Sequence, residues 1–319
     1  MELLPFTFFE FVGREAVYSF QRGSNMDIKQ YVAEEMEKYD GVSFPIKSSM
    51  IRRLWVWAVK CKDLHPNPED EFCNPDIGPS FRIISEYQHK LKNSAMHPYG
   101  AMDESNEPII VERMYPEGYM IVNGHHRWAA AMLRQKPYIE VKIVNLTHEA
   151  DVKKMLSKTK NDKRVALDLD EVVFGKEGED NLEKKLPFPF DHEYKQRLRS
   201  GIPALFNYLN RHDYDVWVYT SNYYSFDYLK QMFKRYHVKV NGVITGNSKR
   251  SAESKNRINK MILEKYKTTV HVDRKAVLKT FSDNDEFIEK EIIPDKQNWS
   301  LAVMKLMDEI EAADMAAAQ

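Results

Sequence analysis

Short apolar segments alternate with segments of helical periodicity over two long stretches of the chain. In the upstream stretch, apolar runs at 109–111 and 119–122 flank the turn-forming triplet Pro-Glu-Gly at 116–118, which predicts two neighbouring strands. The alanine-rich segment 125–135 then predicts a helix, and the alternating segment 138–146 predicts another strand. The upstream stretch is therefore expected to be a small α+β unit.

The downstream pattern is a regular alternation of strand and helix. Apolar residues recur at helical spacing in 202–212, 228–236 and 254–266, and each of these segments lies between short apolar strands. This rhythm is typical of a doubly wound parallel sheet, and a last helical pattern follows at 300–314. The four predicted strands are RVALDLD (164–170), YDVWVYTSN (214–222), VNGVITGN (240–247) and TTVHVDR (268–274).

A polar stretch separates the two patterns and ends in a cluster of basic residues, KTKNDKR. Composition shifts of this kind mark domain boundaries. We predict an N-terminal extension without assignment at 1–54, a first domain at 55–148, a linker at 149–163 and a second domain at 164–319. The segment WVWAV at 55–59 fits either the first strand of the upstream sheet or a helix.

The overall composition indicates a globular protein of two ordinary domains. The chain has 319 residues, of which 43% are hydrophobic and 30% are charged, and this balance argues against disorder. A formal net charge of -1 gives no general electrostatic case for nucleic acid. Local basic patches would still keep nucleic acid open as a partner.

The sequence gives no sign of a membrane or a secretory route. No apolar run approaches the length of a membrane span, and the apolar start contains Glu2, Pro5 and Glu10 without a basic residue before them. Cys61 and Cys73 are the only cysteines and match no zinc or CxxC spacing, which suggests a reducing compartment. We therefore predict a cytoplasmic protein with no membrane partner.

The most informative motif is the pair of carboxylates at the end of the strand RVALDLD, Asp168 and Asp170. Carboxylates at i and i+2 of a strand lie on the same side, so both can face one cation or one phosphoryl group. One carboxylate can attack phosphorus while the other donates and accepts the proton. A divalent cation neutralises the negative charge of the substrate oxygens. A calcium loop fails because Val172 and Val173 stand where it needs an oxygen donor and a glycine. The alternative is a buried strand that ends in an acidic turn.

Polar residues also follow the neighbouring strands, and ligands of open parallel sheets bind beyond the carboxyl ends of the strands. Thr220, Ser221 and Asn222 follow the second strand, where they can hold phosphate oxygens or cap the next helix. Asp273 follows the last strand, as a second anchor for a cation or as an ordinary turn acid. These residues and the two carboxylates are expected to meet at one edge of the sheet.

A lysine at the same edge would neutralise the acids and the phosphate oxygens. Lys255 follows Ser254 at the predicted start of the helix before the last strand, and it is the candidate for this role. Lys249 is a competing choice, and a lysine at a helix start is in most proteins simply solvated.

In their order along the chain, these features resemble the haloacid dehalogenase (HAD) superfamily. The resemblance covers the downstream stretch and rests on DLDEV, on VYT, on a lysine at a helix start and on HVD. It implies an HAD-like Rossmannoid fold and a magnesium-dependent phosphohydrolase. Asp168 would form an aspartyl phosphate, and Asp170 would act as acid and then as base. Thr220 and Lys255 would hold the phosphoryl group, while Asp168, Asp170 and Asp273 would bind Mg²⁺.

The chain departs from the superfamily pattern at Arg274, which follows Asp273 at a place where a second acid is common. The segment between Phe174 and Lys195 is too short for a large cap domain, and PFPF interrupts it. By analogy with the superfamily, a small insert favours bulky or macromolecular substrates. The resemblance leaves the substrate open among a phosphorylated metabolite, a nucleotide and a nucleic-acid end.

A second constellation, VNGHHRWAAA, precedes the alanine-rich upstream helix. Gly124 permits a close backbone approach, Arg127 offers a planar fork for phosphate, and the amino end of the helix points to the same place. His125 and His126 add hydrogen-bond donors; because they are adjacent they point apart, which disfavours a zinc site. The alternative is a helix start with a structural arginine ion pair.

Together with KDLHPNPED and NEPIIVER, this segment resembles the ParB/sulfiredoxin-like fold over about residues 55–146. The resemblance implies a domain that binds ATP or CTP, as in partition proteins, sulfiredoxins and free-serine kinases. His125 and His126 stand where sulfiredoxins have their cysteine, and no helix-turn-helix follows, which argues against sulfinic acid repair and specific DNA binding. In the kinase branch an acid near HPNP acts as the base, and Glu69 or Glu71 would be that acid.

We therefore predict an HAD-like phosphatase fused to a nucleotide-binding or kinase module. The alternative is a nucleotide-sensing interaction protein whose HAD fold is catalytically silent.

Overall fold

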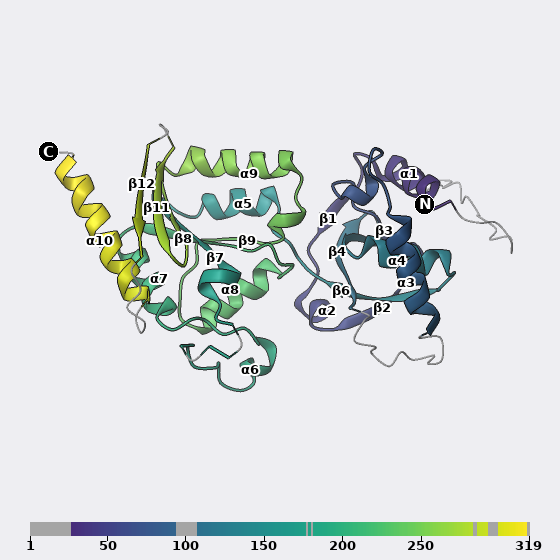
Figure 1. Ribbon diagram of the computed structural model, residues 1–319, viewed down its shortest axis with the longest axis horizontal. Helices are drawn as coiled ribbons and strands as arrows, with labels where there is room; N and C mark the ends of the chain where they lie inside the picture. Colours follow the sequence, from purple (N-terminus) through teal and green to yellow (C-terminus); the bar gives the residue numbers. More distant parts are fainter. Residues whose placement is uncertain are drawn as a thin grey trace, which may run out of the picture.

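The computed structural model describes residues 27–93, 107–176, 178–179, 181–282, 286–292 and 299–317 (Figure 1). They form two six-stranded sheets, one from the upstream and one from the downstream part of the chain. Both sheets contain parallel strand pairs and pack against helices, so the protein is of the α/β class, as predicted. Within these ranges no helix is both long and apolar enough to cross a membrane.

The upstream sheet has the strand order β2-β6-β4-β5-β3, with β1 paired to β4. The pairs β4–β6 and β3–β5 are parallel and the others are antiparallel, so this sheet is mixed. The segment WVWAV contributes a strand and not a helix. The elements are α1 (Ile28–Tyr39), β1 (Phe44–Ile46), α2 (Met50–Leu54), β2 (Val56–Lys60), β3 (Leu64–His65), α3 (Phe81–Asn93), β4 (Ile109–Tyr115), β5 (Tyr119–Asn123), α4 (His125–Leu133) and β6 (Tyr138–Ile143).

The downstream sheet has the order β12-β11-β10-β7-β8-β9. The strands β10, β7, β8 and β9 are parallel, as the alternating pattern predicted, and β7 lies between β10 and β8. An antiparallel hairpin of β11 and β12, which the sequence analysis did not foresee, extends one edge. The elements are β7 (Lys163–Asp168), α6 (Phe190–Glu193), α7 (Ile202–Arg211), β8 (Tyr214–Tyr219), α8 (Phe226–Arg235), β9 (Gly242–Ile244), α9 (Ala252–Lys265), β10 (Thr268–Val272), β11 (Ala276–Phe281), β12 (Phe287–Glu291) and α10 (Trp299–Ala317).

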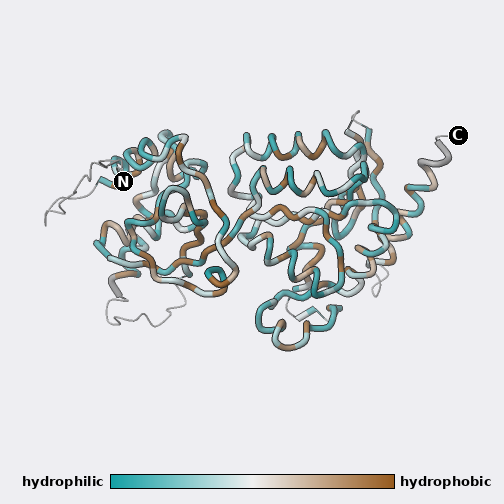
Figure 2. Tube along the Cα trace, turned by 180° about the vertical axis from the view of Figure 1, so that it is seen from behind, coloured by the Kyte–Doolittle hydropathy of each residue, from teal (hydrophilic) through white to brown (hydrophobic). Residues whose placement is uncertain are grey.

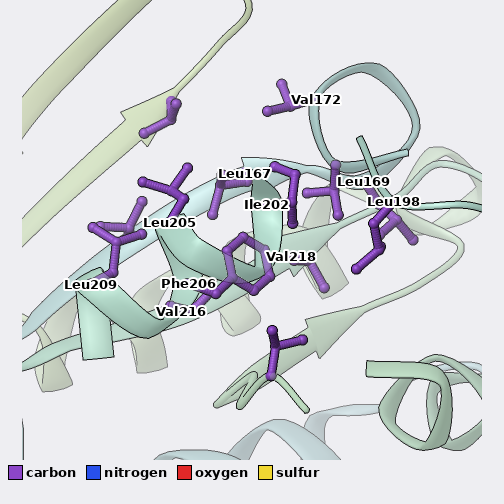
Figure 3. Packing of buried hydrophobic residues seen from close by; sticks show 14 of the residues in the cluster. Leu167, Leu169, Val172, Leu198, Ile202, Leu205, Phe206, Leu209, Val216 and Val218 are labelled. Carbon is purple, nitrogen blue, oxygen red and sulfur yellow. The ribbon is translucent and has the colours of Figure 1, made fainter. Parts of the chain in front are cut away.

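Helices cover both faces of the downstream sheet because the inner strand β8, between β7 and β9, is apolar on both sides. Val216 and Val218 pack with Phe206 of α7 in one buried cluster (Figure 3). Trp217, between them in sequence, faces the opposite cluster with Ile262 of α9. Complete burial of one such side chain stabilises a fold by about 1.5–3 kcal/mol. Figure 2 accordingly shows hydrophobic residues along the central strands and mainly hydrophilic ones on the outer helix α9.

The predicted linker at 149–163 contains a helix, α5 (Glu149–Leu156), that packs on the downstream unit. Val152 and Met155 lie one turn apart on this helix and are buried against α9 and β9. The polar residues around them hid this narrow apolar stripe in the sequence. The segment that joins the two sheets is therefore held in place over its first half.

Hydrogen bonds in a buried polar seam also join the two halves directly. The Asn145 N–H donates to Ser225 Oγ at 3.0 Å, and the Asn145 carbonyl accepts the Phe226 N–H at 3.0 Å. Thr147, which is fully buried, donates from Oγ1 to the Val243 carbonyl at 2.9 Å. Buried polar groups of this kind are costly to leave unpaired, so the seam favours one arrangement of the two halves.

Candidate functional site

Asp168 ends β7, and a single π-helical turn, Leu169–Val173, begins directly after it. Oδ1 of Asp168 accepts the N–H groups of Asp170 at 2.8 Å and of Glu171 at 2.7 Å, which fixes the carboxylate at the start of the turn. Partial loss of hydration, together with the negative charge of Asp170, raises the pKa of Asp168 against the opposing effect of the two N–H groups. The side chain remains accessible to solvent.

The second carboxylate is tied to the neighbouring strand. Thr220, the residue after β8, is buried and donates from Oγ1 to Oδ2 of Asp170 at 2.5 Å. The same hydroxyl oxygen accepts the Asn222 N–H at 2.9 Å. The structure thus brings Asp170 and Thr220, fifty residues apart, together beside Asp168, as expected of residues at the carboxyl ends of adjacent parallel strands.

Ser221 and Asn222 are exposed and contribute mainly through their backbones. The Ser221 carbonyl accepts the hydroxyl of Ser248 at 3.0 Å, and the Asn222 carbonyl accepts the Gly246 N–H at 3.0 Å. These bonds hold the turn that carries Thr220 against the loop that follows β9.

Asp273 follows β10 and is next to Asp168 in the strand register, because Val272 pairs with Leu167. Its carboxylate accepts the N–H of Arg274. Across the described residues, no three His, Cys, Asp or Glu side chains converge closely enough to hold a metal ion by themselves. The predicted trio of carboxylates shares one edge of the sheet but does not form a closed site.

Lys255 lies in the first turn of α9, whose N-cap residue is Ser251. Within the described part of the chain, no ion pair joins it to Asp168 or Asp170. The side chain of Lys249, the competing choice, lies outside the described residues.

The upstream half contains a cavity of about 590 Å³, within the usual size of small-ligand sites. It lies between the start of α4, helix α3 and the loop that precedes α3. The residues named by the sequence analysis that line it are Glu71, Gly124, His125, His126 and Arg127. Ser80, Tyr87 and Asn123 also line it and were not predicted. Asn123 lies within the segment VNGHHRWAAA, and Tyr87 shares helical spacing with the buried Ile84.

Gly124 is the N-cap residue of α4, with a left-handed φ of 108°. A Cβ at this position would lie 2.9 Å from Nη2 of Arg127 and 3.1 Å from Cγ1 of Ile109. Arg127 donates to the Glu107 carbonyl, which holds its guanidinium over the glycine. Glycine is therefore needed both for the backbone conformation and for the position of Arg127.

Gly124→Ala is expected to lower the free energy of unfolding by about 1–2 kcal/mol, because a left-handed conformation is costly for an L-residue. It should also displace Arg127 from the cavity. Gly41, with φ of 65° and open space around it, is the matched control. Urea unfolding should show a loss of stability for both alanine variants, whereas the affinity for a ligand of the cavity should fall only for Gly124→Ala. Equal affinities in the two variants would contradict this role of Gly124.

The two adjacent histidines point to opposite ends of the loop over the cavity. Nε2 of His125 accepts the Asn67 N–H at 3.1 Å, and Nε2 of His126 accepts the Ser80 N–H at 3.1 Å. A ring nitrogen that accepts a hydrogen bond carries no proton, so in this arrangement these atoms hold the loop and do not donate to a phosphate. Nδ1 of His125 lies 3.6 Å from Oδ2 of Asp70, and the rings of both histidines pack against Phe72. The donor role toward phosphate stays a prediction.

Glu69 and Glu71, the two candidate bases, have different surroundings. Glu71 lines the cavity. Oε2 of Glu69 instead accepts the Ser251 N–H at 3.2 Å, at the start of α9 in the downstream half. The geometry therefore favours Glu71 for chemistry in the cavity and gives Glu69 a contact between the halves.

Comparison with known proteins adds one family match. The ParB N-terminal domain matches residues 86–159, a range that includes Gly124 to Arg127. This match supports the ParB-like part of the predicted resemblance from residue 86 onward and leaves the segment KDLHPNPED outside it. The HAD-like part stays a prediction. No curated protein matches the chain. Among solved structures, a free serine kinase mutant in complex with AMP aligns at 11% identity and a TM-score of 0.23, covering 80% of this chain and 96% of that chain. A score this low supports no conclusion about fold or function.

Proposed function

We propose that the downstream half is a phosphohydrolase that acts on a phosphomonoester through an aspartyl-phosphate intermediate. The observation that carries the proposal is the 2.5 Å hydrogen bond from Thr220 to Asp170, next to the exposed carboxylate of Asp168. This bond joins the ends of β7 and β8. The HAD-like resemblance implied that Thr220 holds the phosphoryl group, whereas its hydroxyl here donates to Asp170. A metabolite, a nucleotide or a nucleic-acid end could each supply the phosphate.

In the first step, an oxygen of Asp168 attacks phosphorus and the bond from phosphorus to the leaving oxygen breaks. Asp170 donates its proton to that oxygen. Because Thr220 already donates to Oδ2 of Asp170, the transferable proton belongs on Oδ1. In the second step, Asp170 takes a proton from water, the water oxygen attacks phosphorus, and the bond to Asp168 breaks.

Magnesium is part of this proposal and would neutralise the oxygens of the phosphoryl group. Mg²⁺ commonly uses only one or two protein carboxylates and completes its shell with water and substrate phosphate. The oxygen donors of Asp168 and Asp170 fit this mode, although no closed group of three acids is present in the described residues. Asp273, in register beside Asp168, would be the additional ligand.

For the upstream half, we propose a nucleotide-binding module that takes ATP or CTP, with kinase activity through Glu71. The N–H groups at the start of α4 and the guanidinium of Arg127 converge on the same cavity and can receive phosphate oxygens. The matching ParB N-terminal domain covers this segment, which supports the assignment.

Arg127→Ala is expected to weaken nucleotide binding by about 1.5–3 kcal/mol, or roughly 10- to 150-fold, because a hydrogen bond to a charged phosphate is lost. Calorimetry of the intact protein with ATP and with CTP measures the change. Arg134, exposed at the other end of α4, is the matched control, and Arg134→Ala should retain affinity. If no nucleotide binds to the folded protein, the cavity is structural.

The second candidate function is a nucleotide-sensing interaction protein without phosphatase activity. Arg274 favours this second function, because a positively charged residue follows Asp273 at a position where a second acid is common in the HAD superfamily. Hydrolysis of p-nitrophenyl phosphate with Mg²⁺ and with excess chelator distinguishes the two. Magnesium-dependent turnover supports the phosphohydrolase, and its absence in a folded protein that binds nucleotide supports the sensor.

A further inference from the structure

Arg199 is held against the turn that carries the proposed catalytic carboxylates. Its Nε donates to the Val172 carbonyl at 3.1 Å, and its Nη2 donates to the carbonyls of Glu171 at 3.2 Å and of Phe174 at 3.3 Å. The side chain is only 14% exposed. Its guanidinium is therefore a cation held against backbone carbonyls one, two and four residues beyond Asp170.

Arg274 reaches the same place from the neighbouring strand. It follows Asp273 at the end of β10, and its side chain is 41% exposed. Both arginines contact one carboxylate, that of Glu179: Nη1 of Arg199 lies 3.4 Å from Oε2, and Nη2 of Arg274 lies 3.6 Å from Oε1. Two positive charges, of which that of Arg199 is held in place by backbone carbonyls, thus share one negative charge at the edge of the proposed active site.

The two contacts with Glu179 are longer than ordinary charge-assisted hydrogen bonds, which measure about 2.7–2.9 Å. A phosphate group, with more acceptor oxygens than a carboxylate, could bridge two guanidinium groups more closely. Burial lowers the pKa of Arg199; Glu179 opposes this effect, and the nearby charge of Arg274 adds to it. A ligand with greater negative charge would match this pair better than Glu179 does.

We infer that Arg199 and Arg274 form a subsite for a second phosphate group of the substrate. The inference rests on the proposed phosphohydrolase and specifies its substrate class: a phosphomonoester that carries another phosphate. A nucleoside bisphosphate and a phosphorylated oligonucleotide end share this chemistry. In either case Glu179 occupies the subsite until the second phosphate displaces it.

Kinetics with three substrates test the subsite. These are p-nitrophenyl phosphate with one phosphate, a nucleoside 3′,5′-bisphosphate, and a 5′-phosphorylated dinucleotide whose second phosphate is a diester. The quantity compared is the kcat/KM for a two-phosphate substrate divided by the kcat/KM for p-nitrophenyl phosphate. Arg274→Gln should lower this ratio by about tenfold, and Glu179→Gln should raise it several-fold. The preferred two-phosphate substrate shows whether the second phosphate comes from a nucleoside bisphosphate or from an oligonucleotide end.

Arg211→Gln is the control. Arg211 is an exposed basic residue at the end of α7, near the first residue of β8 and therefore at the end of the strands opposite the proposed active site. It should leave the substrate ratio unchanged. An equal ratio in the wild-type protein and in Arg274→Gln, with turnover retained, overturns the subsite but not the phosphohydrolase.

Binding separates the subsite from catalysis. Calorimetry with the nucleoside bisphosphate in the Asp168→Asn background should show about tenfold weaker binding when Arg274→Gln is added. If the wild-type protein hydrolyses none of the substrates but binding still depends on Arg274, the subsite stands and the phosphohydrolase fails. If Arg274→Gln leaves binding unchanged, the subsite is wrong.

Discussion

Asp168→Asn is expected to reduce turnover of p-nitrophenyl phosphate by at least about a thousandfold, since losses of several powers of ten are usual when a nucleophile is removed. The amide keeps the shape of the carboxylate, and its oxygen can still accept the N–H groups of Asp170 and Glu171. It cannot act as an anionic nucleophile. Steady-state hydrolysis with Mg²⁺ measures the loss.

Glu171→Gln provides the matched control for this change. Glu171 is exposed three residues beyond Asp168, and its contacts with Asp168 and Arg199 use only its backbone. Its variant should keep most of the turnover. Circular dichroism and the unfolding midpoint should be similar for both variants. A folded Asp168→Asn protein with turnover close to wild type would exclude the aspartyl-phosphate mechanism.

Glu71→Gln is expected to reduce nucleotide-dependent phosphorylation by about a hundredfold or more, the usual contribution of a general base. Glu71 lines the upstream cavity, where its carboxylate could take the proton of an acceptor hydroxyl. The assay uses the intact protein with ATP or CTP and a panel of small hydroxyl metabolites that includes serine.

Glu69 provides the matched control for Glu71. Glu69→Gln removes a carboxylate two residues away that contacts Ser251 and not the cavity, so it should preserve activity. Equal losses in the two variants would contradict the assignment to Glu71. If the wild-type protein phosphorylates no acceptor while it still binds nucleotide, the upstream half is a nucleotide sensor and not a kinase.

Several features of the site could be predicted from the sequence because their signals are local. The run of apolar residues before Asp168 predicts a strand, and two carboxylates at its end predict a polar edge. Gly124 before an alanine-rich segment predicts a helix start, and the structure places it in a left-handed conformation beside Arg127. The family match at residues 86–159 supports the ParB-like part of the resemblance. The HAD-like part and the roles of the downstream residues remain predictions.

Other features depend on contacts between distant segments, for which the sequence has no local signal. Only the path of the loop before α3 separates Glu71, which lines the cavity, from Glu69, which contacts Ser251 in the downstream half. The contact of Arg199 and Arg274 through Glu179 joins three segments that share no periodic pattern.

By itself, then, the sequence determined the α/β class, the positions of the main strands along the chain and the residues available at their ends. Periodicity and turn chemistry act over a few neighbouring residues, so they can be recognised in the sequence. The tertiary structure alone decided that β11 and β12 extend the sheet, that α5 is packed and not a free linker, and which charged side chains meet. These outcomes depend on register and on long-range packing, whose free energy appears only when distant parts of the chain come together.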